Sequence, residues 1–257
     1  MNPRLSNFTS RILAQCVHFA QQLVAPSCLL CAGPSAGALL CKPCEDDLPH
    51  LLPVAPAHGA LCDTCALPIT AGTRCGACLA NPPAYDHICA PFTYAFPADA
   101  LVRALKYRNG LAIAPLLGNA IADTLDVRPD VIIPMPLADA RLRERGFNQA
   151  QEIARHVARR SGIRLAPRAC RKVRDTAPQA ALPWKERAKN VRKAFVCDED
   201  FTGLHVTVVD DVMTTGATLN EIARNIKQAG AARVTGLIAT RTLPGAFRKN
   251  RTHAPDV

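Results

Sequence analysis

Apolar positions along the larger, C-terminal part of the chain follow two periods, one typical of strands and the other of helices. Short apolar runs rich in β-branched residues predict buried strands at residues 131–133, 206–209 and 234–239. Apolar residues that recur every three or four positions predict helices at residues 100–106, 111–125, 149–160 and 221–228. Because strands that alternate with helices form parallel sheets with right-handed crossovers, the pattern predicts an α/β domain over residues 90–243.

The two ends of the chain differ from this region. Residues 1–25 are predicted to form an amphipathic helix with one apolar face, made of Ile12, Leu13, Cys16, Phe19, Ala20 and Leu23. That face is expected to pack on the neighbouring cysteine-rich module, with binding to a membrane surface as the alternative. Polar residues interrupt any signal-peptide core, and no apolar run is long enough to span a membrane, so we expect a cytoplasmic protein. The polar residues 244–257 are expected to be a disordered tail.

A duplicated cysteine pattern precedes the α/β region. Eight of the 12 cysteines form four Cys-x-x-Cys pairs, and the second four repeat the first four at an offset of 34 residues: Cys28, Cys31, Cys41, Cys44, Cys62, Cys65, Cys75 and Cys78. In a chain without an export signal, such pairs favour tetrahedral Zn²⁺ over disulfides. The pattern predicts two structural zinc sites, paired sequentially or crossed between the halves, with a redox-active pair as the weaker alternative. The other four cysteines are interpreted as ordinary small apolar residues: Cys16, Cys89, Cys170 and Cys197.

Residues 206–218 form the segment that indicates a ligand. A buried strand is followed by Asp210 and Asp211, and then by a turn rich in Thr and Gly that leads into a helix. The free N–H groups and positive dipole end of that helix can surround a phosphate, together with the hydroxyl groups of Thr214, Thr215 and Thr218. A carboxylate pair at the carboxyl end of a strand suits ribose hydroxyls or the Mg²⁺ that accompanies pyrophosphate. The combination predicts a phosphosugar site; the alternative is a structural strand, loop and helix with a solvated acidic turn.

Charge is distributed unevenly along the chain. The formal net charge is +10, yet residues 1–89 carry a net charge of −1. Residues 141–193 contain 16 Lys/Arg and only 4 Asp/Glu. Such an excess predicts a polyanionic ligand or partner, and single-stranded nucleic acid fits it, although few aromatic residues interleave with the charges. The alternative is a charge that serves solubility alone.

Two further segments carry candidate ligand groups. Residues 134–154 follow the strand predicted at 131–133, and they place Arg141 and Arg145 where they could bind pyrophosphate bidentately. Asn148 and Gln149 are expected to cap or orient that loop, and the alternative is a capped helix with a basic face. Residues 171–195 lack clear periodicity and predict a mobile loop or lid, with a surface linker as the alternative.

The segment VTVVDDVMTTGAT resembles the loop that binds 5-phosphoribosyl 1-pyrophosphate (PRPP) in type I phosphoribosyltransferases. No Gly-x-Gly-x-x-Gly or Gly-x-x-x-x-Gly-Lys pattern competes with it, which disfavours a dinucleotide or P-loop site. The resemblance implies that Asp210 and Asp211 are the catalytic acids that hold the ribose hydroxyls, with Mg²⁺ bound alongside PRPP. It implies that the PRPP-binding residues, with the 5′-phosphate on Thr214 to Thr218, are Val212, Met213, Thr214, Thr215, Gly216, Ala217 and Thr218.

Four segments in this order, LKYRNG, PMPLADARLRERGFNQAQEIA, RDTAPQAALPWKERAKNVRKAF and VVDDVMTTGAT, resemble the ComF family of competence-associated proteins. The resemblance covers nearly the whole chain. It implies a double zinc ribbon at residues 26–85 before a type I phosphoribosyltransferase domain with a flexible hood, and a role in handling imported single-stranded DNA. It also implies that Lys106 and Tyr107 lie near the site entrance, that residues 141–149, including Asn148, form the pyrophosphate side, and that the hood contains Gln179, Arg187 and Asn190. The stretch AALPW departs from the expected flexible hood sequence.

Three functions remain open at this point. The chain is a glycosyltransferase that expels Mg²⁺-pyrophosphate from PRPP, a binding protein for which PRPP is a regulatory ligand and single-stranded DNA the partner, or a nucleobase-salvage enzyme. The third is less attractive because it needs neither zinc ribbons nor surplus positive charge. A homodimer and contacts with competence machinery are left open as further partners.

Overall fold

The computed structural model describes residues 27–51, 60–174 and 187–244, with the side chains of residues 187 and 188 excepted. The helix predicted at residues 1–25, the tail after residue 244 and Gln179 therefore lie outside the described residues. The chain divides into two compact units, residues 1–48 and 49–257. The boundary falls within residues 26–85, the range predicted as one cysteine-rich module, so each cysteine group belongs to a different unit.

The described part of the first unit is a small loop structure with one short helix. The main chain reverses at residues 28–33, where Cys28 N donates to Gly33 O at 2.7 Å. Helix α2 (Lys42–Asp46) follows and buries none of its residues. Among residues 27–48 of this unit, the buried aliphatic side chains are Leu40 and Leu48. So little apolar burial leaves residues 27–48, the described part of this unit, in need of another source of stability.

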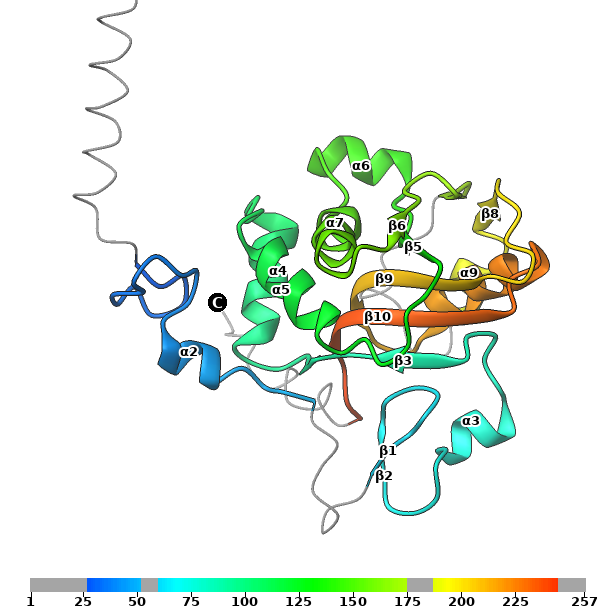
Figure 1. Ribbon diagram of the computed structural model, residues 1–257, viewed down its shortest axis with the longest axis horizontal. Coiled ribbons are helices and arrows are strands. Elements are labelled where there is room, and N and C mark those ends of the chain that lie inside the picture. The colour runs from blue at the N-terminus through cyan, green and yellow to red at the C-terminus, as the bar shows by residue number, and fades with distance from the viewer. Residues whose placement is uncertain (1–26, 52–59, 175–186, 245–257) are drawn as a thin grey trace, which may run out of the picture. The chain divides into compact units, whose positions relative to one another are not determined.

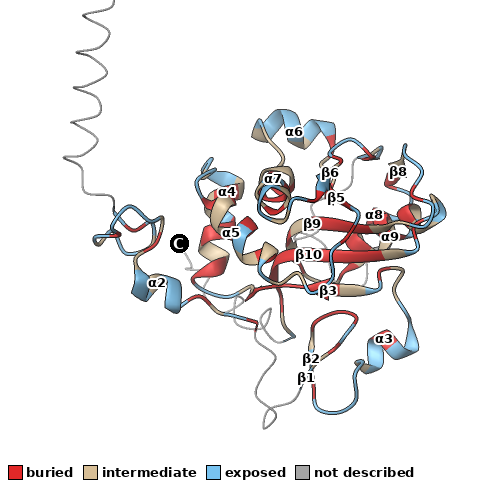
Figure 2. Cartoon of the chain, in the orientation of Figure 1, coloured by how far each residue is buried: buried red, intermediate tan, exposed pale blue. Residues whose placement is uncertain are grey.

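A parallel sheet forms the centre of the second unit (Figure 1). Its strands, in spatial order, are β3 (His87–Cys89), β10 (Arg233–Arg241), β9 (His205–Met213), β5 (Val131–Pro134) and β6 (Arg164–Leu165). All these neighbours pair in parallel, and β4 (Phe92–Thr93) adds to the end of β10. Val206, Val208 and Val209 of β9 are fully buried, as a strand covered on both faces requires (Figure 2). The predicted α/β class is confirmed.

Helices cover the sheet, and each helix predicted within residues 90–243 is present with adjusted ends. They are α4 (Ala98–Tyr107), α5 (Ile113–Ala122), α7 (Gln149–Ser161) and α9 (Ala217–Gln228). Helices α5 and α7 pack on each other so closely that a Cβ at Gly118 would lie 2.6 Å from His156 Cβ. Helix α9 connects β9 to β10 and lies across the sheet from α7 (Figure 1).

Several short elements have no counterpart in the sequence pattern. Between β5 and α7 lies α6 (Asp139–Arg145), which ends at Gly146 in the left-handed conformation. The basic segment predicted as a loop contains β7 (Cys170–Lys172), α8 (Arg187–Val191) and β8 (Phe195–Cys197). Strands β7 and β8 are antiparallel, and Cys170 lies directly opposite Cys197. These two cysteines, interpreted from sequence as having no partner, are therefore neighbours, because the pairing of the strands brings together residues that are distant in the chain.

The second cysteine group is built into the second unit. It lies around β1 (Ala60–Leu61), β2 (Pro68–Ile69) and α3 (Gly76–Ala80). Cys62, Cys65 and Cys78 belong to the same buried cluster as Tyr85 and Ile88 and the inner residues of β9 and α9. The module that precedes the sheet is thus in part a component of its core.

Candidate functional site

The acid pair lies within strand β9, which is longer than the sequence predicts. The strand continues to Met213, so Asp210 and Asp211 lie in its second half and do not leave its end. Because successive side chains of a strand point to opposite faces, the two carboxylates separate. Asp210 lines a cavity, whereas Asp211 is only 3% exposed and is not among the described residues that line it. The two acids, predicted to share one role, have different environments.

Asp211 is paired with a lysine from α4. The Nζ atom of Lys106 lies 2.9 Å from Asp211 Oδ1. Burial opposes the charge of Lys106, but the Asp211 carboxylate outweighs it and raises the pKa of the lysine. The second oxygen, Oδ2, accepts no hydrogen bond from the described residues. Asp211 therefore anchors Lys106, whose side chain also lines the cavity.

Asp210 is the acid that faces the cavity. Its Oδ1 accepts a hydrogen bond from Asp211 N at 2.9 Å. Burial, together with the neighbouring Asp211 charge, raises the pKa of Asp210 to about 7, although Lys106 opposes this shift. A carboxylate held at such a cost is a good ligand for a cation or for hydroxyl groups, since either would relieve the cost of its charge.

The turn after β9 has the form of an anion site. Gly216 has φ +79° and is the N-cap of α9. Thr215 Oγ1 accepts from Ala217 N at 3.1 Å, which holds the turn in shape. A 12-residue helix follows, with its first N–H groups directed toward the turn. A phosphate group placed here would meet main-chain donors, the dipole end and threonine hydroxyl groups.

One cavity of about 260 Å³ brings these groups together. Its wall contains Asp210 and the whole segment 212–218, and the same face of α4 contributes Arg103, Lys106 and Tyr107. Sequence analysis missed Arg103, although its spacing of three and four residues from Lys106 and Tyr107 places all three on one helical face. It also missed other lining residues from three separate segments, for which no local signal exists: Tyr94, Leu219, Ile238 and Thr242.

The predicted pyrophosphate residues lie at different distances from this cavity. The Arg145 guanidinium carbon is 5.2 Å from the centroid of the Tyr107 ring, so Arg145 lies beside a cavity wall. Asn148 accepts from Ala150 N and donates to Met135 O, both at 3.0 Å, so it caps α7 and fixes the loop after β5. Arg141, on α6, is not among the described residues that line the cavity.

The predicted hood residues lie in or beside the part that the structure leaves undescribed. Gln179 and the Arg187 side chain are outside the described residues. Asn190 is on α8, and its carbonyl accepts from Arg174 Nη2 at 2.7 Å. Asn190 is not among the described residues that line the cavity, and the relation of Gln179 and Arg187 to it stays a prediction.

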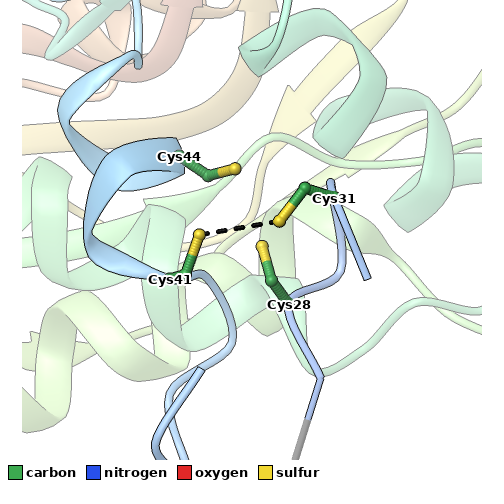
Figure 3. Close-up of side chains that lie close together, drawn as sticks. All are labelled: Cys28, Cys31, Cys41 and Cys44. Carbon is green, nitrogen blue, oxygen red and sulfur yellow. Dashed lines mark hydrogen bonds between the residues drawn. The ribbon is translucent and has the colours of Figure 1, made fainter. Parts of the chain in front are cut away.

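Each cysteine group has the geometry of a tetrahedral metal site. The four Sγ atoms of each group lie within 4.8 Å of one another. A tetrahedron with Zn–S bonds of ~2.3 Å has edges of about 3.8 Å. The distances from Cys31 Sγ to Cys41 Sγ (3.6 Å; Figure 3) and from Cys65 Sγ to Cys75 Sγ (3.7 Å) agree with this. The groups are Cys28, Cys31, Cys41, Cys44 and Cys62, Cys65, Cys75, Cys78, so the cysteines are grouped sequentially and not crossed.

The thiols of each group favour a cation. Burial opposes ionisation of Cys62, but N–H groups of Cys75, Cys65 and Thr64 outweigh it and lower the pKa of this thiol to about 7. By contrast, burial and the neighbouring cysteines raise the pKa of Cys78 far above its usual value. The Cys62 thiolate thus forms readily, whereas the Cys78 thiolate does not form unless a metal ion neutralises the charge of the group. Both groups can hold structural zinc.

The central strand of the parallel sheet carries an acid pair and leads into a glycine turn at the start of a helix. Together these features define a protein of the type I phosphoribosyltransferase fold, here preceded by a small cysteine-rich module. No protein-family model matches the chain. DNA utilization protein YhgH of Escherichia coli O6:H1 is 35% identical to it over 192 residues, which are 71% of this chain and 85% of that protein. The chain belongs to the ComF family, and the resemblance predicted from its sequence is confirmed.

Other similar proteins have related names. Competence protein F of Haemophilus influenzae is 32% identical over 172 residues, 63% of this chain and 75% of that protein. Competence protein ComFC of Bacillus subtilis is 29% identical over 148 residues, 55% of this chain and 58% of that protein.

Solved structures with which the chain has a likeness include two proteins of purine metabolism. The allosteric regulatory enzyme of purine biosynthesis shares 24% identity with a TM-score of 0.33, over 49% of this chain and 25% of that one. A purine phosphoribosyltransferase from Pyrococcus horikoshii Ot3 shares 20% identity with a TM-score of 0.29, over 55% of this chain and 90% of that one.

Within the described residues, no helix is both long and apolar enough to cross a membrane.

Proposed function

We propose that the chain binds Mg²⁺-PRPP in the cavity between α4 and the turn after β9. The observation that supports this most is the meeting, in one cavity, of the Asp210 carboxylate, the cations of α4 and the turn at residues 214–218. PRPP carries the complementary groups: ribose hydroxyls, a 5′-phosphate and a pyrophosphate. Membership of the ComF family and the phosphoribosyltransferase fold favour the same ligand.

Each part of the cavity has a distinct task in this proposal. The turn from Thr214 to Thr218 holds the 5′-phosphate through main-chain N–H groups and hydroxyls. Asp210 accepts hydrogen bonds from the ribose hydroxyls. Lys106, held by Asp211, and Arg103 stabilise the pyrophosphate, and Mg²⁺ supplies further charge neutralisation when bound with it.

If the chain is an enzyme, it is a glycosyltransferase. A nucleophilic atom of the acceptor forms a bond to ribose C1, while the bond from C1 to pyrophosphate breaks and its electron pair leaves with the pyrophosphate. Lys106 and Arg103 stabilise that departing charge. Pyrophosphate release measured with PRPP and each nucleobase in turn, and with single-stranded DNA, separates the three open functions. Release with one acceptor identifies an enzyme and its substrate, whereas tight binding without release identifies a PRPP-binding protein.

Isothermal titration tests the binding itself. Replacing both Asp210 and Asp211 by Ala removes the cavity carboxylate and the anchor of Lys106, so PRPP affinity should fall at least tenfold, about 1.4 kcal/mol. A matched control replaces the adjacent exposed acids Asp46 and Asp47 of the first unit, which changes the net charge equally. Equal PRPP affinities of the wild type and the Asp210/Asp211 variant would refute the proposal.

We further propose that the basic span from Arg141 to Lys193 binds single-stranded DNA, and that the chain acts in the handling of DNA taken up by the cell. The names of its relatives, DNA utilization protein and competence protein, favour this partner. The structure sharpens the choice of residues. Arg160 and Arg171 are ion-paired with Asp123 and Asp198, at 2.6 and 2.7 Å, so their charges are partly compensated on the protein.

Exposed arginines of the span that form none of those pairs are the better test. Arg159 and Arg168 are exposed, and replacing both by Gln should weaken binding of a fluorescent oligonucleotide while leaving PRPP affinity unchanged. If phosphate contacts dominate, log affinity should fall linearly with log salt, with a slope of about −0.7 per phosphate neutralised. A variant with Lys42 and Arg74 replaced by Gln, outside the span, is the control. Affinity that does not depend on salt would leave the charge as a solubility feature.

A further inference from the structure

Arg241 is a buried cation at the end of β10. Its side chain is 2% exposed. All four of its hydrogen bonds to described residues end on main-chain carbonyl oxygens. Nε donates to Cys65 O at 2.9 Å, and Nη1 lies within bonding distance of Met213 O (3.0 Å), Thr214 O (2.5 Å) and Thr242 O (2.9 Å). One guanidinium therefore ties together three separate segments of the second unit.

The segments that it joins are the two chemical features of that unit. Cys65 is a member of the second cysteine group, and Met213 and Thr214 begin the turn that lines the cavity. The planar guanidinium has donors in fixed directions, so its position relative to Cys65 fixes its position relative to the turn. A displacement of the Cys62–Cys65 loop would be transmitted to the carbonyl groups of Met213 and Thr214.

Two further contacts join the same regions. The Tyr85 hydroxyl lies so close to the turn that a Cβ at Gly216 would be 2.9 Å from it. Ala84 N donates to Asn220 Oδ1, in the first turns of α9, at 2.6 Å. The chain that leaves the second cysteine group thus supports both the glycine of the turn and the start of the helix behind it.

The charge of Arg241 also has a partner in this arrangement. A closed site with four thiolates and one Zn²⁺ has a net charge of about −2. A buried guanidinium needs an opposite charge nearby, because carbonyl oxygens satisfy its donors but leave its charge uncompensated. The negatively charged zinc–thiolate site and the Arg241 guanidinium would then stabilise each other across Cys65. Without the metal, the guanidinium would lose this electrostatic contribution to holding it in position.

We propose that Arg241 is a positioning residue through which the second cysteine group, when it holds zinc, sets the position of the turn at residues 213–218 and so the affinity for a sugar phosphate. The idea rests on the proposed binding of PRPP in the cavity. It adds that one zinc site supports ligand binding and that the first, in a different unit, does not. Because coupling between two sites is reciprocal, bound PRPP must in turn retain zinc in the second group.

Zinc release from the full-length protein measures this coupling without any assay of catalysis. Zinc transfer to a coloured chelator is followed with and without saturating Mg²⁺-PRPP, and a Cys28→Ser variant identifies the phase that belongs to the first group. We expect PRPP to slow the second-group phase at least fivefold, as a coupling at the lower end of the typical range does when it is lost before zinc leaves, and to leave the other phase unchanged. The Asp210→Ala, Asp211→Ala variant shows whether PRPP acts by chelating zinc in solution, since that effect would persist in the variant.

The variant Arg241→Lys tests the residue itself. Lysine keeps the charge but cannot span the acceptors that Nε and Nη1 reach, so PRPP affinity should fall about tenfold while the zinc content stays at two per chain. Arg233→Lys, at the opposite end of β10, is the matched control and should bind PRPP as the wild type does.

The outcomes separate this proposal from the one on which it rests. If the wild type gives no binding heat with PRPP, the proposed function fails and the coupling fails with it. If PRPP binds but slows neither phase of zinc release, or slows both equally, only the coupling is overturned. A folded Arg241→Lys protein with PRPP affinity within twofold of the wild type also overturns it, and if this variant does not fold, zinc release from the wild type still decides.

Discussion

The two cysteine groups share one spacing but not one environment, and this contrast shows how little a ligand pattern says about its surroundings. In the first group Cys31 is exposed, and the adjoining helix α2 buries none of its residues. In the second group Cys62 and Cys65 are 1% and 4% exposed and belong to the core that also contains β9 and α9. The two copies of the duplicated sequence therefore differ in structure: the first belongs to a small unit, and the second is a component of a larger domain. The same metal should then stabilise different things: a local loop structure in the first case, and a candidate ligand site in the second.

Removing the ligands of one group at a time should give the largest difference. Cys62→Ser with Cys65→Ser should destabilise the second unit by about 3 kcal/mol or more, because it removes metal ligands from within a core. Cys28→Ser with Cys31→Ser should leave the main thermal transition of the second unit unchanged. Calorimetric scans of both double variants, with the zinc content of each, check this. Equal shifts of the main transition in the two variants would show that the contrast between the groups has no energetic meaning.

Glycine replacement compares the two units at single positions with similar backbone conformations. Gly216 has φ +79°, and a Cβ there would lie 2.9 Å from the Tyr85 hydroxyl oxygen. Gly37 in the first unit has φ +89°, and a Cβ there would meet nothing within 4 Å. Gly37→Ala should cost only the strain of a positive φ, about 1 kcal/mol, whereas Gly216→Ala should cost roughly 1–3 kcal/mol more, as overpacking does. Urea unfolding measures both, and PRPP titration should detect a loss only in Gly216→Ala.

Asp210 provides an effect on stability that depends on pH and has the opposite sign. Its pKa in the folded protein, about 7, lies above the usual value for an aspartate, so the carboxyl group favours folding while it is protonated and loses that contribution as pH rises through 7. Asp210→Asn should therefore stabilise the ligand-free protein at about pH 8 and have little effect at about pH 4. Urea unfolding at both pH values checks the sign, and Asp47→Asn, on the exposed surface of the first unit, is the control. The same variant should lose PRPP affinity, which would identify a residue kept for binding at the expense of stability.

Sequence periodicity predicted the helices and central strands because these elements are set by which face is buried. It stopped β9 at Val209, since aspartates are poor strand residues and their presence there depends on compensation by Lys106, a contact made by tertiary structure. The phosphate-type turn was predictable because its chemistry lies within one short segment. Arg241 was not, because an arginine at the end of an apolar run gives no local sign that it is buried or that its acceptors come from Cys65, Met213 and Thr214.

The cysteine pattern illustrates the same limit. Spacing predicted two four-cysteine groups correctly, because a tight turn brings residues three apart onto one ion. It left open which pairs combine, and the structure groups them sequentially. The division of the chain between Leu48 and Pro49 had no composition signal, since it depends on what the second group packs against.

The strand parity of the two aspartates makes the last residues of β9 intolerant of any change in length. The adjacent acids lie on opposite faces, so inserting one residue between Val209 and Asp210, or deleting Val209, would exchange their faces. Asp211, which anchors Lys106, would then face the cavity, and Asp210 would be enclosed. A substitution in β9 therefore changes one side chain, whereas an insertion or deletion moves every later side chain of the strand to the opposite face. Homologous chains that keep the acids should show gaps in the loops before and after β9, and none within it.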